Sequence, residues 1–228
     1  MSCDLEVARP DGPLFRLGRV PDAWSWPDWA YAGEDGTFGN RFDDPVGEYR
    51  VLYASTQRLG GFLETLARFR PDPAIVVERI SGDPRDQQFA TGPAGAVPAR
   101  WLERRVLGVA RCDATFADVG HARSLAYLRE ALAASVVRHG LDDLDAAAIR
   151  LRAPRRFTQE ISRHVYECTA ADGSRAFQGI HYLSRLGDDI GNWAICEPAV
   201  IDALDSEDLR RDDPDLTQAL ELFGLVLA

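Results

Sequence analysis

Residues 40–69 constrain the fold more than any other stretch, because an arginine, a short apolar strand and an amphipathic helix follow one another there. Arg41 lies in a turn rich in Asp and Pro, and the run that ends at Tyr53 has the composition of a short buried strand. The helix expected next carries one carboxylate, Glu64, on its apolar side. Its apolar neighbours in sequence are Phe62, Leu63, Leu66 and Phe69. An acid in such surroundings is costly to bury unless a cation or a hydrogen bond meets it, so Arg41 is the nearest candidate partner.

Apolar periodicity predicts further strands and helices on both sides of this stretch. Strands are expected at residues 14–20, 74–80, 106–110, 179–185 and 192–196, the last two as a hairpin. Helices are expected at residues 97–105, 121–139, 155–168 and 216–222, with Asp215 as the cap of the last one. Because no Gly-rich phosphate loop follows a strand, a Rossmann or P-loop fold is not indicated. The irregular order favours one α+β domain over residues 1–228, with a mixed or antiparallel sheet core flanked by helices.

Two segments are expected to lack regular structure. Residues 1–13 are polar and contain Pro and Gly, so we expect a poorly ordered lead-in. Residues 21–40 show no helical or strand period, yet they carry Trp24, Trp26, Trp29 and Tyr31. Such aromatic density disfavours disorder. Two interpretations stay open: a lid over a site, or rings that plug one end of the core.

Charge and the chain ends limit the partners. The formal net charge is -10, which argues against direct nucleic-acid binding because phosphate contacts need a basic surface. The arginines that crowd one stretch, Arg150, Arg152, Arg155 and Arg156, are more typical of a solvated face or a partner contact. The N-terminus lacks the apolar core of a signal peptide, and the apolar run at residues 222–228 is too short to span a bilayer. These features predict a cytoplasmic protein without membrane contact.

The cysteines predict neither a zinc knuckle nor a redox pair. Cys3, Cys112, Cys168 and Cys196 are widely spaced and form no CxxC motif, so we expect reduced thiols. His164 and Cys168 lie four residues apart on an expected helix and can share one face. Two ligands without a third nearby favour a packed histidine and a buried thiol, and no metal is expected.

Several short motifs occur in a fixed order along most of the chain: Arg41-Phe42, Tyr53-Ala54-Ser55, Glu64-Thr65-Leu66 and Gly179-Ile180-His181-Tyr182-Leu183-Ser184-Arg185. In this order they resemble the core of the RES domain family, and the resemblance covers roughly residues 14 to 200. Two positions depart from the family pattern. Asn40 stands where a glycine is usual, and Phe42 stands where tryptophan is frequent, which bears on the turn and on one wall of the pocket.

The resemblance implies a fold, an activity and a partner. RES proteins have a core similar to that of ADP-ribosyltransferase toxins, and they act as NAD glycohydrolases or phosphorylases, many paired with an Xre-type antitoxin. Carried onto this chain, the resemblance makes Glu64 and Arg41 catalytic, and it assigns NAD binding to Arg16, Arg41, Tyr53 and Ser184. NAD is then a substrate rather than a cofactor, inorganic phosphate is a candidate co-substrate, and no oligomeric state is indicated.

The chemistry of these residue types agrees with that activity. Cleavage of the nicotinamide-ribose bond passes through an oxocarbenium-like transition state, which one carboxylate can stabilise. Nicotinamide leaves as a neutral molecule, so no general acid is needed. Two alternatives stay open: transfer of ADP-ribose to a macromolecule, and a non-catalytic RES-fold binding protein. In the last case Arg41 and Glu64 would form only a structural ion pair.

Overall fold

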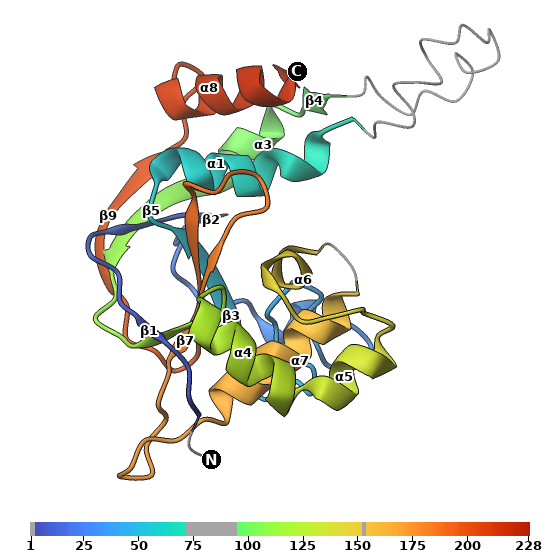
Figure 1. Ribbon diagram of the computed structural model, residues 1–228. Helices are drawn as coiled ribbons and strands as arrows, with labels where there is room; N and C mark the ends of the chain where they lie inside the picture. Colours follow the sequence, from blue (N-terminus) through green and yellow to red (C-terminus); the bar gives the residue numbers. More distant parts are fainter. Residues whose placement is uncertain (1–2, 72–94, 152–153) are drawn as a thin grey trace, which may run out of the picture.

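A mixed eight-stranded sheet forms the centre of the computed structural model, which describes residues 3–71, 95–151 and 154–228 (Figure 1). Its strands in spatial order are β1 (Val7–Ala8), β6 (Phe116–Asp118), β7 (Gly179–Leu183), β8 (Gly191–Cys196), β3 (Val51–Ser55), β2 (Leu14–Arg19), β5 (Arg105–Arg111) and β9 (Asp202–Asp208). Neighbouring strands run antiparallel except β6 and β7. A separate parallel pair joins β4 (Ala96–Val97) to β10 (Val226–Leu227). This arrangement confirms the α+β prediction.

Two groups of helices pack against the same face of the sheet. The first consists of α1 (Arg58–Leu66), α3 (Arg100–Glu103) and α8 (Pro214–Phe223), and the second of α4 (Ala122–Ala131), α5 (Ala133–Arg138), α6 (Ala146–Arg150) and α7 (Arg155–Tyr166). Phe15 of β2 and Ser55 of β3 are paired directly, so residues two and four positions away share their face. On that face Leu17 packs in the core of the first group and Val51 in the core of the second. Figure 1 shows the two groups as separate bodies, above and to the lower right.

The opposite face of the sheet is covered in part by the aromatic loop. Trp24 is buried there with Leu52 and Trp193, whereas Trp29 and Tyr31 are 39% and 66% exposed. A short 3-10 helix, Trp29–Tyr31, lies within the loop. Packing of Trp24 supports the interpretation that the rings fill one side of the core. For the remaining rings, a lid over a site stays a prediction.

Most expected elements are present, and they differ from the predictions in their bounds, in one interruption and in one cap. The strand expected to end at Tyr53 continues to Ser55. The helix expected over residues 121–139 is interrupted at Leu132, which separates α4 from α5. The cap of the last helix is Asp213, whose carboxylate accepts hydrogen bonds from the Asp215 and Leu216 amides. The strand predicted at residues 74–80 lies outside the described residues.

The N-terminal segment and two cysteines differ from their prediction. Residues 3–13 are part of the fold, because β1 pairs with β6 and Leu5 is buried. Cys3 and Cys168 form a disulfide with their Cα atoms 5.7 Å apart, so the expectation of reduced thiols is wrong for this pair. A separation of 165 residues gives no sequence signal for such a contact. Cys112 and Cys196 are buried free thiols, as expected. None of the helices in the described ranges is both long and apolar enough to cross a bilayer.

Candidate active site

Glu64 presents an anchored carboxylate at the surface of α1. Its Oε1 accepts hydrogen bonds from Ser184 Oγ at 2.6 Å and from Asn192 Nδ2 at 2.7 Å. Glu64 is exposed, whereas Ser184 and Asn192 are only 1% and 2% exposed. Within the described ranges no hydrogen bond reaches Oε2. The carboxylate is therefore fixed through Oε1, and among the described residues Oε2 is left for a bound molecule. The prediction that Glu64 lies on the apolar side of the helix is wrong, because the residue is exposed.

Close packing of α1 on β3 places this carboxylate. The helix buries its own side chains Phe62, Leu63 and Leu66 against the core. At Gly60 a Cβ atom would lie 2.3 Å from Ser55 Oγ, so a larger residue would push the helix off the strand. Glycine at this position brings α1 within reach of the ends of β7 and β8, where Ser184 and Asn192 lie.

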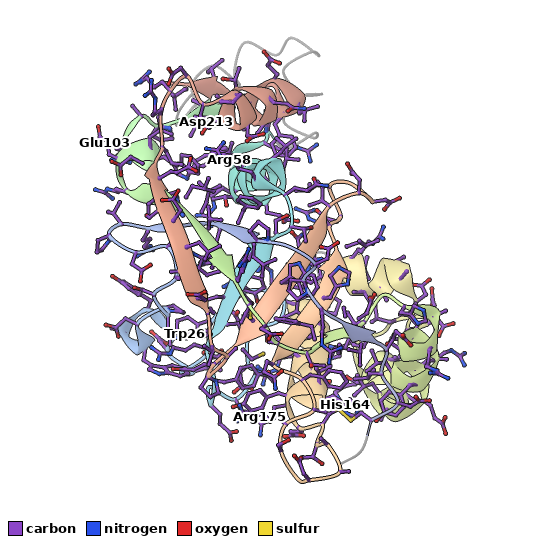
Figure 2. All side chains as sticks on the ribbon, turned by 90° about the vertical axis from the view of Figure 1, so that its left-hand side faces the viewer. Trp26, Arg58, Glu103, His164, Arg175 and Asp213 are labelled. Atoms are coloured by element: carbon purple, nitrogen blue, oxygen red, sulfur yellow. A yellow bond between two sulfur atoms is a disulfide. The ribbon has the colours of Figure 1, made fainter. Side chains whose placement is uncertain are left out.

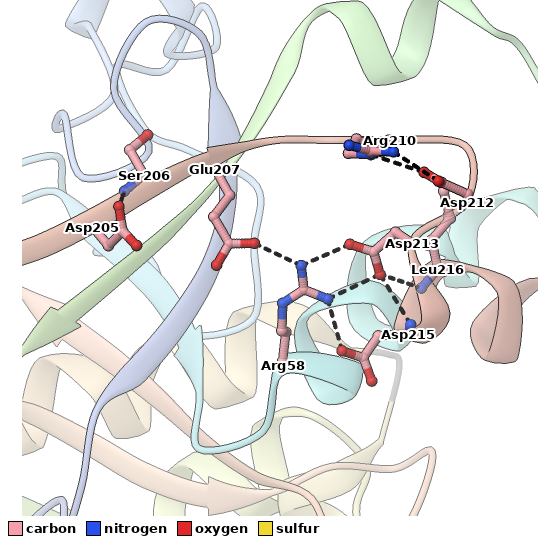
Figure 3. Close-up of polar contacts among 9 residues, drawn as sticks. All are labelled: Arg58, Asp205, Ser206, Glu207, Arg210, Asp212, Asp213, Asp215 and Leu216. Atoms are coloured by element: carbon pink, nitrogen blue, oxygen red, sulfur yellow. Dashed lines mark hydrogen bonds and ion pairs between the residues drawn. The ribbon is translucent and has the colours of Figure 1, made fainter.

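An ion-pair network holds the N-terminal end of α1 (Figure 3). The guanidinium of Arg58 donates to both carboxylate oxygens of Asp213, at 2.9 and 2.7 Å, and also contacts Asp215 and Glu207 at 2.8 Å each. Burial raises the pKa of Asp213, but the hydrogen bonds from Arg58 and from the Leu216 amide outweigh it and hold that pKa below its ordinary value. The network thus ties α1 to β9 and α8.

Arg58→Met is expected to lower the free energy of unfolding by about 2 kcal/mol, because it leaves the Asp213 carboxylate buried without its cation. Arg210→Met is the matched control, since Arg210 and Asp212 pair with 75% and 69% of their side chains exposed, and its expected effect is under ~0.5 kcal/mol. Urea denaturation of both variants at neutral pH gives the two values. Equal losses would contradict the role assigned to Arg58.

The stability lost in Arg58→Met is also expected to depend on pH. A carboxyl group whose folded pKa is depressed contributes stability that is complete above its unfolded pKa, about 4, and is lost as the pH falls through the folded pKa. The difference between wild type and Arg58→Met should therefore narrow in acid, as Asp213 becomes protonated.

Helix α7 shapes the turn that carries Arg41. Three of its side chains donate to main-chain oxygens of the turn: Thr158 to Arg41 at 2.6 Å, Ser162 to Phe42 at 2.7 Å and Gln159 to Asn40 at 3.1 Å. From the other side, the Asp43 carboxylate accepts from the Asn40 amide at 2.7 Å. The main chain at Arg41 is thus held from both sides.

Arg41 and Glu64 do not form the ion pair that the sequence led us to expect. Across the residues that the structure describes, no ion pair joins them. Instead the Arg41 guanidinium carbon lies 5.8 Å from the ring centroid of Tyr182. The pKa of Tyr182 is raised chiefly by burial, is raised further by Glu64 and is lowered by Arg41. Both charged groups therefore act on the same buried ring, which lies on the strand before Ser184.

An open cavity of about 460 Å³ is lined by Ala146, Ala147, Arg150, Leu151 and Arg185. Arg185 directly follows Ser184, the residue that binds Glu64. Arg150 is paired with Asp188 in the β7–β8 turn at 2.5 Å. Glu64 and Arg41 are not among the lining residues. The link between the cavity and the carboxylate is the pair of sequence neighbours Ser184 and Arg185.

The family model of the RES domain matches residues 13–217. The chain belongs to the RES domain family. Comparison with curated proteins gave no match. Among solved structures, a chain of the M. tuberculosis MbcT-MbcA toxin-antitoxin complex is similar with a TM-score of 0.51 and 16% identity, covering 96% of this chain and 92% of that one. At this identity the likeness shows a shared fold.

The two departures from the RES domain pattern are accommodated in this chain. No described residue other than glycine has a positive φ, so Asn40 needs no glycine-like backbone. Phe42 is fully buried, and its ring centroid lies 4.8 Å from that of Tyr182. The turn and the wall of the site therefore form with the residues present.

Three other residues predicted from the RES domain motifs already have partners in the protein. The Tyr53 hydroxyl donates to Asp43 at 2.7 Å and accepts from the Phe42 amide, and burial raises its pKa. Arg16 donates to the carbonyl oxygens of Ala23 and Tyr53, at 2.7 and 2.8 Å, from the face of the sheet opposite α1. The Ser184 hydroxyl donates to Glu64. Direct NAD contacts by Tyr53, Arg16 and Ser184 stay predictions.

Sequence reasoning missed the roles of Asn192 and Tyr182 in this RES domain. Asn192 is a polar residue at the start of an otherwise apolar strand, and its buried Oδ1 has no hydrogen-bond partner among the described residues. A buried amide in such a strand needs a polar partner, which was the available signal. Tyr182 belongs to the motif at residues 179–185, but its sequence position indicated no part in the chemistry.

Proposed function

We propose that this RES domain cleaves the nicotinamide-ribose bond of NAD, as a glycohydrolase or a phosphorylase. The observation that carries the proposal is the exposed Glu64 carboxylate, which Ser184 and Asn192 hold through a single oxygen. Positive charge develops on the ribose as the bond breaks, and a fixed carboxylate beside it lowers the barrier more than a mobile one.

The proposed reaction breaks the C–N bond between ribose and nicotinamide and forms a C–O bond to water or phosphate. Nicotinamide leaves with the electron pair of the broken C–N bond and is neutral. Water attacking the ribose carbon gives ADP-ribose and one proton, whereas phosphate gives ADP-ribose phosphate. The Glu64 carboxylate supports the developing cation through Oε2, the oxygen that Ser184 and Asn192 do not bind.

The cationic groups around the carboxylate suit the rest of the substrate. Arg41 lies half-buried at the Tyr182 ring, and a guanidinium there can bind the diphosphate or the ribose with forked donors. A guanidinium at this position favours an anionic nucleotide over a neutral sugar.

A toxin role and a protein partner belong to the same proposal. The similar solved structure is a toxin-antitoxin complex. We therefore propose that a separately encoded antitoxin of the Xre type binds and inhibits this chain. Co-purification with the product of a neighbouring reading frame tests this partner independently of the chemistry.

The proposed reaction is tested by incubating the purified protein with NAD, with and without phosphate, and following free nicotinamide by chromatography. Release in both conditions identifies a glycohydrolase, and release only with phosphate identifies a phosphorylase. Labelled NAD distinguishes ADP-ribosyl transfer, because label then appears on a macromolecule. No nicotinamide in any arm would overturn the proposal and favour a binding protein.

A further inference from the structure

A third potential metal ligand joins His164 and Cys168 in the folded protein. The ligand atoms of Cys3, His164 and Cys168 all lie within 4.8 Å of one another. Sequence alone offered only the pair on the helix. The fold adds Cys3 from the opposite end of the chain, so one place now holds two sulfurs and one imidazole.

The main-chain positions of all three residues are fixed by the fold. His164 lies in the last turn of α7, and Cys168 follows with its amide bonded to the Val165 carbonyl at 3.1 Å. The segment that carries Cys3 is held by the Glu6 amide, which donates to Ser124 Oγ of α4 at 2.9 Å, and by the pairing of β1 with β6. Such a cluster does not depend on a flexible tail for its geometry.

A neighbouring hydroxyl orients the imidazole. Tyr127 Oη of α4 lies 3.1 Å from His164 Nε2. Histidine ligands are commonly held in this way through the ring nitrogen that does not bind the metal. In Figure 2 His164 lies at the end of the molecule opposite Arg58 and Asp213, which places the cluster far from the network at the start of α1.

We propose that Cys3, His164 and Cys168 bind a zinc ion when the Cys3–Cys168 disulfide is reduced. A dithiol reductant transfers two electrons and two protons to the disulfide and is itself oxidised to a disulfide. Zinc then displaces a proton from each thiol. Two thiolates at about 2.3 Å from one zinc lie roughly 3.7 Å apart, so the two sulfurs must separate once the disulfide bond is broken, and the imidazole nitrogen already lies within 4.8 Å of both.

The ligand set favours zinc over harder cations. Thiolates and imidazole bind zinc, whereas magnesium and calcium take oxygen ligands. Three protein ligands leave a fourth position for water, as in open zinc sites. The site would join the N-terminal segment to the end of α7 in a reducing compartment, where a disulfide does not persist.

The test is zinc binding by the full chain, reduced under anaerobic conditions and dialysed against limiting zinc. We expect one zinc ion per chain by atomic absorption, and none in the oxidised protein. Cobalt in place of zinc should give the absorption bands of a tetrahedral thiolate site. Cys3→Ala and His164→Ala should each weaken binding by more than the roughly 10-fold loss expected from Tyr127→Phe, which removes only a hydrogen bond to a ligand.

Cys112→Ala is the control, because Cys112 is a buried thiol outside the cluster. It should bind zinc as the wild type does. The proposal is overturned if the reduced wild type binds no more zinc than Cys3→Ala, or if Cys112→Ala loses binding to the same degree. Circular dichroism identifies a variant that fails to fold, and Cys3→Ala, which changes only the N-terminal segment, then decides the outcome.

Discussion

Glu64→Gln is expected to reduce the rate of nicotinamide release from NAD at least ~100-fold, which corresponds to about 2.7 kcal/mol of lost transition-state stabilisation. Glutamine has the same shape, and its amide oxygen can still accept from Ser184 and Asn192. It carries no charge, however, so it cannot stabilise the cation that develops on the ribose. Since this interaction exists mainly in the transition state, kcat should fall while KM changes little.

The control for this variant is Glu130→Gln, which removes an exposed carboxylate from the helix α4. It should retain wild-type activity, and both variants should keep the wild-type free energy of unfolding within ~0.5 kcal/mol. If Glu64→Gln releases nicotinamide as fast as Glu130→Gln, the carboxylate has no part in the reaction.

Local patterns predicted the elements that carry the site. The strand before Ser184 and its hairpin partner were expected from their apolar composition, and the structure pairs them as β7 and β8. Phe62 and Leu66, four residues apart, predicted the helix α1 and are both fully buried in it. These elements are predictable because burial of one face imposes a period that the sequence must carry.

Contacts between distant segments were not predictable from periodicity. The sequence suggested an ion pair between Arg41 and Glu64. In the structure Glu64 accepts hydrogen bonds from Ser184 and Asn192, and the Arg41 guanidinium lies over the Tyr182 ring. Charge complementarity alone cannot choose between an ion pair and neutral donors, because the cost of burying each group depends on packing. For the same reason no pattern indicated that Cys3 lies beside Cys168.

The strand β9 lacked any apolar signal. All seven of its residues are exposed, and four of them are acidic: Asp202, Asp205, Glu207 and Asp208. It is a strand because its main chain pairs with β5, with a register shift between Val109 and Ala110. Exposed charges at the edge of a sheet disfavour pairing with another chain. The pairing with β5 therefore makes this segment a strand, and its own composition does not predict one.

Asp44→Ala, in the turn before β3, is expected to cost about 3 kcal/mol of stability. The carboxylate is fully buried and accepts from three main-chain amides, at 3.3 Å from Val46, 2.5 Å from Glu48 and 3.3 Å from Tyr49. Alanine leaves these amides without an acceptor, and a buried unpaired donor costs about 1–3 kcal/mol. Chemical denaturation followed by tryptophan fluorescence measures the loss.

Asp35→Ala separates this burial effect from the loss of hydrogen bonds as such. Asp35 also accepts from a main-chain amide and a hydroxyl, both of Thr37, but it is exposed, so water can replace it. Its expected cost is under ~1 kcal/mol. Asp44→Asn keeps one acceptor oxygen and should fall between the two. If Asp44→Ala is no more destabilising than Asp35→Ala, the turn that leads from Arg41 into β3 does not depend on its buried carboxylate, and other contacts of that turn, such as those from α7, must hold it.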